Sequence, residues 1–178
     1  MYPWSGKNIY FIGFMAAGKS TIGSAFAAYL GWPFVDTDTC IEETAGKSVP
    51  EIFAEQGETA FRDMETRAIR NLAQRKNTVV ALGGGAVLRE ENWQLLDASG
   101  ITIWLNIPVS AVAQRVAASP HRPLLAGLAD SERRKKIRTM MQTRKPDYQR
   151  ARVKRNCSGK QPVNKVVFDL FERLLYES

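Results

Sequence analysis

A glycine-rich segment, Gly13–Thr21, constrains this chain more than any other part of its sequence. It reads Gly-Phe-Met-Ala-Ala-Gly-Lys-Ser-Thr and matches the pattern G-x-x-x-x-G-K-S/T in full. An apolar run, Ile9–Ile12, precedes it, and a helix-like stretch, Ser20–Leu30, follows it. In this strand–loop–helix context, backbone N–H groups and a helix N-terminus can cradle phosphate groups. The motif therefore predicts a phosphate-binding loop at the end of a strand.

The side chains of this loop predict a nucleoside triphosphate site. Lys19 can reach the β and γ phosphates as a point charge, and the hydroxyl of Ser20 can ligate Mg²⁺. The other nucleotide contacts predicted in the loop are Gly13, Ala16, Ala17, Gly18 and Thr21. Ligands of such folds lie at the carboxyl ends of the strands, so further chemistry is expected just after the other strands.

Apolar runs alternate with helix-like stretches along the chain. The runs are residues 9–12, 33–35, 78–82, 101–105 and, more weakly, 152–157. The helix-like stretches are residues 20–30, 59–75, 90–98, 109–117, 131–143 and 162–176. This alternation predicts an α/β fold with a parallel sheet covered by helices on both faces. The length of 178 residues predicts a single domain over residues 1–178.

Two carboxylates, Asp36 and Asp38, follow the second apolar run. If the chain stays extended there, both project to the same side, and a bound Mg²⁺–nucleotide would relieve their repulsion. The third run ends in glycines and the fourth in Asn106. We therefore expect one acid to serve the metal and the other to face an acceptor hydroxyl. The alternative is a helix N-cap formed by Thr37 or Asp38.

Three consecutive glycines, Gly83, Gly84 and Gly85, follow the third run. They suit a place where the main chain lies against a ligand, although a plain turn is the alternative. Arg62 lies beside the apolar stripe of a predicted helix, where Glu65 at i+3 can pair with it. From these residues alone, a solvated arginine is the ordinary interpretation.

A segment that breaks any helix, Ser119–Gly127, contains Arg122 between two prolines. It is a candidate lid, over about residues 117–129, that closes Arg122 onto the transferring phosphate, or else an inert connection. Further on, Arg144 comes just before Lys145-Pro146, and the proline predicts that a helix ends near Arg144.

Composition narrows the class of protein. No apolar run approaches the roughly 20 residues that cross a bilayer, and no signal-peptide layout is present, so we expect a cytoplasmic protein. The two cysteines, Cys40 and Cys157, show no metal-binding spacing, and His121 is the single histidine. The net charge of +7 suits solubility, nucleic acid or small polyanions. Aromatic residues are not interleaved with the basic run 133–138, so we expect no nucleic-acid partner.

The motifs as a set resemble the shikimate kinase family, in order and in spacing, over most of the chain. They are Gly13–Thr21, Asp36-Thr37-Asp38, Phe61-Arg62 with Glu65, Gly83-Gly84-Gly85, Arg122-Pro123-Leu124-Leu125 and Arg144-Lys145-Pro146-Asp147-Tyr148. The resemblance implies transfer of the γ-phosphoryl group of ATP to the 3-hydroxyl of shikimate, on the route to the aromatic amino acids. It also implies Mg²⁺ as cofactor and a small-molecule acceptor.

The resemblance implies a role for each matched position. Asp36 lies near Mg²⁺ in this assignment, and Asp38 contacts the attacking hydroxyl. Arg62 and Arg144 resemble the pair that holds the shikimate carboxylate, and Arg122 resembles the lid arginine at the γ-phosphate. The remaining implied contacts are Gly83, Gly84 and Gly85 in the acceptor pocket, and Arg115 and Pro162 beside adenine.

The family fold is a three-layer α/β/α arrangement around a five-stranded parallel sheet, usually monomeric, with a mobile lid. The segment 39–65 resembles its small helical substrate-binding part. One departure is visible: family loops often carry glycine where this chain has Ala16. If that position needs a positive φ, alanine adds strain of order 1 kcal/mol, and we expect weakened nucleotide binding at most.

Two other classes share some of these features. Another P-loop metabolite kinase, for gluconate or a nucleoside monophosphate, also needs the loop, a lid and arginines for an anionic acceptor. Asp-Thr-Asp after the second run and the triple glycine after the third argue for shikimate kinase instead. A P-loop ATPase or GTPase that regulates or binds nucleic acid is the second alternative. Asp97–Gly100 fits a GTPase-type DxxG, but no guanine-reading NKxD is present.

Overall fold

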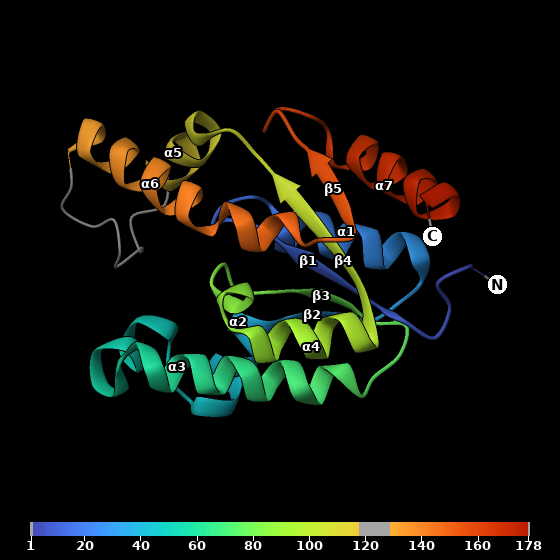
Figure 1. Ribbon diagram of the computed structural model, residues 1–178, viewed down its shortest axis with the longest axis horizontal. Helices are drawn as coiled ribbons and strands as arrows, with labels where there is room; N and C mark the ends of the chain where they lie inside the picture. The colour runs from blue at the N-terminus through green and yellow to red at the C-terminus, as the bar shows by residue number, and fades with distance from the viewer. Residues whose placement is uncertain (1, 118–128, 178) are drawn as a thin grey trace.

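The computed structural model of the protein describes residues 2–117 and 129–177. In these ranges, five strands form one sheet in the order β2-β3-β1-β4-β5, and all neighbouring pairs are parallel (Figure 1). The strands are β1 (Asn8–Ile12), β2 (Phe34–Asp36), β3 (Val79–Ala81), β4 (Gly100–Asn106) and β5 (Val153–Asn156). The five-stranded parallel sheet that the family resemblance implied is confirmed.

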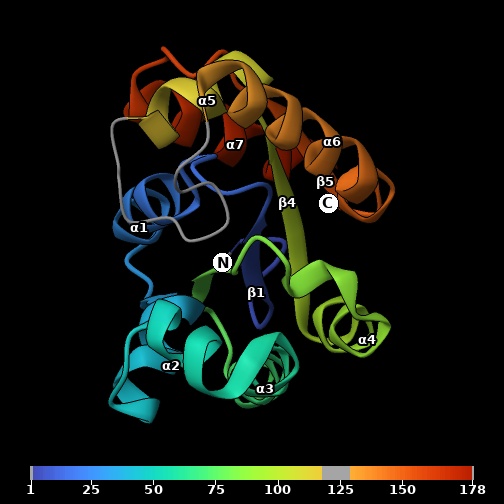
Figure 2. The same ribbon diagram turned by 90° about the vertical axis from the view of Figure 1, so that its left-hand side faces the viewer.

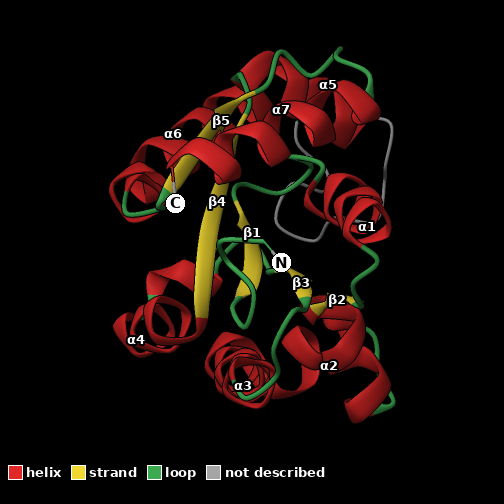
Figure 3. Ribbon diagram, turned by 90° about the vertical axis from the view of Figure 1, so that its right-hand side faces the viewer, coloured by secondary structure: helices red, strands yellow, loops and turns green. Residues whose placement is uncertain are grey.

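Helices pack on both faces of this sheet. They are α1 (Lys19–Leu30), α2 (Thr37–Ala45), α3 (Val49–Ala73), the short 3-10 helix η1 (Ala86–Leu88), α4 (Glu90–Ser99), α5 (Val109–Ala117), α6 (Asp130–Gln149) and α7 (Val163–Glu177). Helices α1 and α7 lie together on one face, and α3 and α4 lie together on the other (Figure 3). The three-layer α/β/α architecture is therefore also confirmed.

The strand order brings the phosphate-binding loop and the two acids to the same end of the sheet. Asp36 at the end of β2 is in register with Ala81 of β3, and Ala81 is in register with Phe11 of β1. All five residues of β1 are buried, as expected for the central strand of a covered parallel sheet. Figure 2 shows α2 and α3 at one end of the molecule and α5 and α6 at the other, with β1 between them.

Helix α3 starts earlier than the predicted stretch 59–75. Its start at Val49 is fixed by a capping box, in which both the backbone N–H and the hydroxyl of Ser48 donate to the carboxylate of Glu51. The helix is kinked at Gly57, where φ is 81° and ψ is 173°. The sequence Ser-Val-Pro-Glu carries the signal for this start, but the helical period alone does not show it.

The prediction that a helix ends near Arg144 is wrong, because α6 continues through Pro146. A proline removes only one backbone donor, and tertiary contacts can compensate for that loss. Tyr148 in the last turn is buried and stacks on Trp104, with ring centroids 5.8 Å apart. Its hydroxyl also donates to the carbonyl of Gly84 at 2.7 Å. These contacts hold the last turn of α6 against the sheet.

The predicted substrate-binding segment, 39–65, carries its own small hydrophobic cluster. Ile41 of α2 and Ile52 and Phe61 of α3 are buried together in this cluster, separately from the main core around β1. The segment therefore packs partly on itself. None of the helices that the structure describes is long and apolar enough to cross a membrane.

Candidate active site

The phosphate-binding loop joins β1 to α1, as the sequence predicts. Gly18 caps the helix in the left-handed region, with φ of 94°, and the first turn of α1 contains no acidic residue. The ammonium of Lys19 donates to the carbonyls of Gly13 and Phe14 at 2.9 and 3.0 Å, so it lies over the loop. Bare helix N–H groups beside a lysine make a site for an anion.

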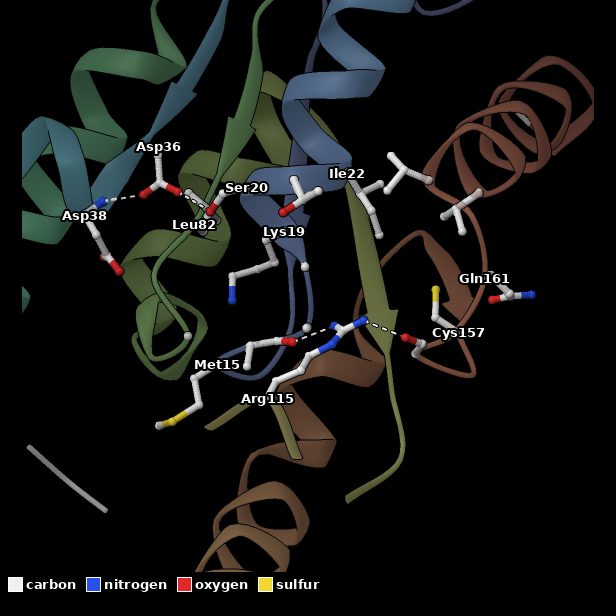
Figure 4. A pocket seen from close by; sticks show the side chains of 18 residues that line it. Met15, Lys19, Ser20, Ile22, Asp36, Asp38, Leu82, Arg115, Cys157 and Gln161 are labelled. Atoms are coloured by element: carbon white, nitrogen blue, oxygen red, sulfur yellow. Dashed lines mark hydrogen bonds between the residues drawn. The ribbon is translucent and has the colours of Figure 1, made fainter. Parts of the chain in front are cut away.

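Arg115 of α5 connects this loop to the segment between β5 and α7. Its guanidinium donates to the carbonyl of Ala16 at 2.8 Å and to the carbonyl of Gly159 at 2.9 Å (Figure 4). With these two contacts, Arg115 lines a cavity beside the phosphate-binding loop; the family resemblance implied that this arginine lies next to adenine. Pro162 does not line the cavity, although Gln161 and Val163 on either side of it do.

Asp36 stands at the junction of β2 and α2 and has two hydrogen-bond partners. Its Oδ2 accepts from the hydroxyl of Ser20 at 2.5 Å, and its Oδ1 accepts from the backbone N–H of Asp38 at 3.0 Å. Asp36 is thus the N-cap of α2, instead of Thr37 or Asp38. The chain is not extended through Asp38, which lies in the first helical turn, so the condition under which the two acids would project to the same side is not met.

The two acids nevertheless share one cavity with the phosphate-binding loop. The cavity measures about 540 Å³, and Lys19, Ser20, Asp36 and Asp38 all line it (Figure 4). Gly84 lies on its wall as well. The sequence did not single out several lining residues: Met15, Ile22, Leu82, Cys157, Gly159, Gln161, Val163 and Val166. Most of these are apolar, and no chemical motif distinguishes them in the sequence.

Arg62 is held in place beside this cavity and is not a solvated arginine. Its Nη1 lies 2.7 Å from Oε2 of Glu65, whose side chain is fully buried, and its Nη2 lies 3.1 Å from Glu58. Only 13% of the Arg62 side chain is exposed. Gly85 has no side chain because a Cβ there would collide with the Arg62 guanidinium. The interpretation of Arg62 as an ordinary surface arginine is therefore wrong.

One buried oxygen from each of two carboxyl groups, those of Glu65 and Asp38, lies next to Gly83. A Cβ at this position would collide with Oε1 of Glu65 and with Oδ1 of Asp38. Neither oxygen has a hydrogen-bond partner in the described part of the chain. Burial raises the pKa of Asp38, and the charge of Asp36 raises it further, while Lys19 opposes the shift. Burial likewise raises the pKa of Glu65, against the opposing charge of Arg62. Both carboxyl groups are therefore more readily protonated than an exposed carboxyl group.

The carbonyl of Gly84 connects the glycine segment to α6. It accepts from Nη1 of Arg144 at 3.2 Å and from the hydroxyl of Tyr148 at 2.7 Å. Burial raises the pKa of Tyr148 to about 12, so its hydroxyl stays a donor at neutral pH. The glycine segment thus lies between Arg62, which packs on Gly85, and Arg144. Arginines on two sides of one backbone turn can bind a single carboxylate.

A family model described as shikimate kinase matches residues 15–175, which is nearly the whole chain.

The chain belongs to the shikimate kinase family.

It is 42% identical to a shikimate kinase of Nitratidesulfovibrio vulgaris over 172 residues, which cover 95% of this chain and 96% of that protein. It is 40% identical to a shikimate kinase of Persephonella marina over 156 residues, which cover 88% and 92%. Function follows from this membership: the protein is an ATP-dependent phosphotransferase with an alcohol acceptor, a shikimate kinase.

Solved shikimate kinases share the whole fold. The enzyme from Bacteroides thetaiotaomicron superposes with a TM-score of 0.89 and 34% identity, over 94% of this chain and 98% of that chain. The enzyme from Acinetobacter baumannii, solved in complex with shikimate, also gives 0.89 and 34%, over 95% and 93%. A gluconokinase from Sinorhizobium meliloti gives 0.54 at 16% identity, which shows only a shared fold. The comparisons therefore do not favour the gluconate kinase alternative.

Two positions of the family pattern, Ala16 and Arg122, differ in what the structure shows of them. Ala16 has a φ of 59°, so the backbone of this chain is left-handed at the position where the family resemblance places a glycine. The positive φ that we named as the condition for backbone strain at Ala16 is therefore present. The predicted lid arginine, Arg122, lies outside the described residues, as does most of the predicted lid at 117–129.

Proposed function

We propose that the 540 Å³ cavity holds ATP and that the acceptor binds at its mouth, between Asp38 and the glycine segment. The observation that carries this proposal is that Lys19, Asp36 and Asp38 line one cavity, with Gly84 on its wall. The P-loop N–H groups and Lys19 bind the phosphates, and Arg115 contacts the nucleotide near adenine. Orientation and charge stabilisation supply most of the catalysis in phosphoryl transfer.

The residues present fit a magnesium ion. Ser20 and Asp36 bring two hard oxygen atoms within 2.5 Å of each other beside the P-loop. In the described ranges, no group of three or more His, Cys, Asp or Glu side chains could hold a metal ion by itself. That suits Mg²⁺, which binds few protein ligands and keeps water and phosphate oxygens. When bound, the ion neutralises charge on the β and γ phosphates.

Asp38 is the acid that we assign to the acceptor's 3-hydroxyl. It extends from the first turn of α2, and its raised pKa makes it a better proton acceptor than an exposed aspartate. Asp36 is already occupied by Ser20 and by the N-cap of α2, which leaves Asp38 as the acid for the substrate. Asp38 thus orients the hydroxyl and takes its proton.

Arg62 and Arg144 are assigned to the shikimate carboxylate, with Gly83, Gly84 and Gly85 as the floor of the pocket. Glu65 keeps the guanidinium of Arg62 in position, because the two form a buried ion pair. Arg122 keeps the role that the sequence predicts for it, at the γ-phosphate. In this proposal, residues 1–178 act as one domain, in which segment 39–65 binds the acceptor and segment 117–129 is the lid.

We also propose that the protein works in the cytoplasm as a monomer. Both cysteines are free in the structure, which suits a reducing compartment. The monomeric state is what the resemblance to the shikimate kinase family implies.

The test is release of ADP from Mg·ATP with a panel of acceptors: shikimate, quinate, gluconate and nucleoside monophosphates. We expect saturable ADP release with shikimate and at least a hundredfold lower kcat/KM with every other compound. Quinate is the sharpest comparison because it has the same carboxylate on a saturated ring. Preference for gluconate or a nucleotide would refute the acceptor assignment, and hydrolysis that needs no acceptor would refute the whole proposal.

A further inference from the structure

A second cavity, of about 360 Å³, lies between α6, the carboxyl end of β4 and Lys154 of β5. Its described lining shares no residue with the cavity of the proposed nucleotide site. A volume above about 300 Å³ is in the range of small-molecule sites in proteins. None of the roles assigned above uses this cavity. The residues that line it therefore indicate which ligand it could bind.

Three aromatic side chains form part of its wall: Phe14, Trp104 and Tyr148. All three are buried, and the Trp104 and Tyr148 rings stack with an angle of 22° between their planes. Buried, mutually packed rings keep their positions when a ligand enters, so little ordering cost is added to binding. Such a wall favours a flat apolar ligand, because ring contacts are offset-stacked or edge-to-face.

Three exposed cations also line the cavity. Arg138 and Lys145 come from α6, and Lys154 comes from β5, with its ammonium 4.9 Å from the centroid of Trp104. The described lining includes no aspartate or glutamate, and none of the three cations forms an ion pair with another described residue. The cavity therefore combines an aromatic wall with uncompensated positive charge, which complements an anion.

We propose that this cavity is a binding site for a planar aromatic carboxylate, separate from the sites for ATP and shikimate. The ring system packs against Trp104 and Phe14, and the carboxylate faces Lys154 and Arg138. A neutral aromatic molecule would leave the cations unpaired, and a small inorganic anion would leave the rings uncovered. Both features are needed to explain the lining.

The site touches both walls of the reaction centre. Phe14 belongs to the P-loop, and its carbonyl accepts from Lys19. Tyr148 donates to the carbonyl of Gly84 in the glycine segment. An occupant therefore contacts residues that position the nucleotide and the acceptor, without lying in either site.

The test uses 2-naphthoate as the probe and the tryptophan indole N–H signals of ¹⁵N-labelled protein as the readout. We expect the Trp104 signal to shift in a saturable way, while the signal of Trp93, which is fully buried and bonded to the carbonyl of Val87, stays in place. The shift should persist with saturating ADP and shikimate. The neutral 2-naphthamide should bind at least about tenfold more weakly.

Charge-neutral variants locate the site. Lys154→Gln and Arg138→Gln should each raise the dissociation constant for 2-naphthoate by about threefold to tenfold. The matched control is Lys135→Gln, an exposed position on α6 that does not line the cavity, and it should leave the constant unchanged. The proposal is overturned if 10 mM 2-naphthoate does not shift the Trp104 signal, or if 2-naphthamide binds as tightly as 2-naphthoate. It is also overturned if ADP or shikimate displaces the probe, or if Lys154→Gln and Arg138→Gln both leave its affinity unchanged.

Discussion

The guanidinium of Arg62 lies 2.7 Å from the carboxylate of Glu65, which has no exposed surface. The pair fills the space beside two glycines: Glu65 packs against Gly83 and Arg62 against Gly85. A buried charge is costly unless it is paired, so Arg62 offsets part of the cost of burying the Glu65 carboxylate, and the two side chains hold each other in position. The ion pair therefore fixes the orientation of the Arg62 guanidinium, which would be mobile if it were exposed to solvent.

Arg62→Lys should weaken acceptor binding specifically. An ammonium cannot make the two parallel contacts that a guanidinium makes to a carboxylate. We expect KM for shikimate to rise about tenfold or more, with kcat and KM for ATP changed less than threefold. Arg67→Lys on the exposed side of α3 is the control, and steady-state kinetics should not distinguish it from wild type. An unchanged KM for shikimate in Arg62→Lys would show that Arg62 has only a structural role.

Asp38→Asn should abolish turnover while ATP still binds. The amide cannot accept the hydroxyl proton, and general-base catalysis is worth about 10²- to 10⁴-fold. Calorimetry with a non-hydrolysable ATP analogue should give a dissociation constant within threefold of wild type. The control is Glu43→Gln, an exposed position on the same helix. Turnover within a few-fold of wild type would remove Asp38 from the mechanism.

Glu65→Gln should change how stability depends on pH. Burial raises the folded-state pKa of Glu65 above its unfolded value, so the protonated form stabilises the protein. That contribution is present in full below the unfolded pKa and is lost as pH rises through the folded pKa. The glutamine variant has no such loss, so its Tm relative to wild type should be higher at pH 8 than at pH 5.

The control for this pH dependence is Glu58→Gln. Glu58 also pairs with Arg62, but its side chain is 64% exposed, and exposed pairs contribute little. We expect its Tm difference from wild type to be small and the same at both pH values. A parallel pH dependence in the two variants would show that the buried position of Glu65 is not the cause.

Ala16→Gly should stabilise the P-loop. The backbone at this position has a φ of 59°, which costs a non-glycine residue about 1 kcal/mol. We expect a gain in unfolding free energy of up to about 1 kcal/mol and an ATP affinity less than tenfold higher. Ala17→Gly is the control and should destabilise the protein, because Ala17 is buried and has no positive φ. A tenfold or greater rise in affinity for Ala16→Gly would mean that strain at Ala16 governs nucleotide binding.

Local chemistry in the sequence fixed several features in advance. The P-loop, the strand–helix alternation and the parallel sheet follow from short-range patterns, because glycine spacing and apolar periodicity are set by neighbouring residues. A short-range pattern also gave one wrong prediction: the proline at position 146 predicted that a helix ends near Arg144. Burial of Tyr148 against Trp104 outweighs the cost of the proline, and no window of a few residues contains that information.

The acids after β2 show the same contrast between what the sequence predicts and what tertiary packing decides. The sequence placed Asp36 and Asp38 at the end of a strand, and the family resemblance divided their roles. The chain does not stay extended there, since Asp36 caps α2 and Asp38 lies in its first turn. Which side chain caps a helix depends on the backbone angles at the junction, and these are decided by how α2 packs.

By itself, the sequence determined the phosphate-binding loop, the class of fold and, through the set of its motifs, the family. Only the tertiary structure decided that Glu65 lies buried against Asp38 and Arg62, and that Gly83 and Gly85 leave room for these side chains. It also decided that α6, β4 and β5 enclose a second cavity. The physical reason is that burial and charge pairing join residues far apart in the chain, whereas sequence patterns report on near neighbours.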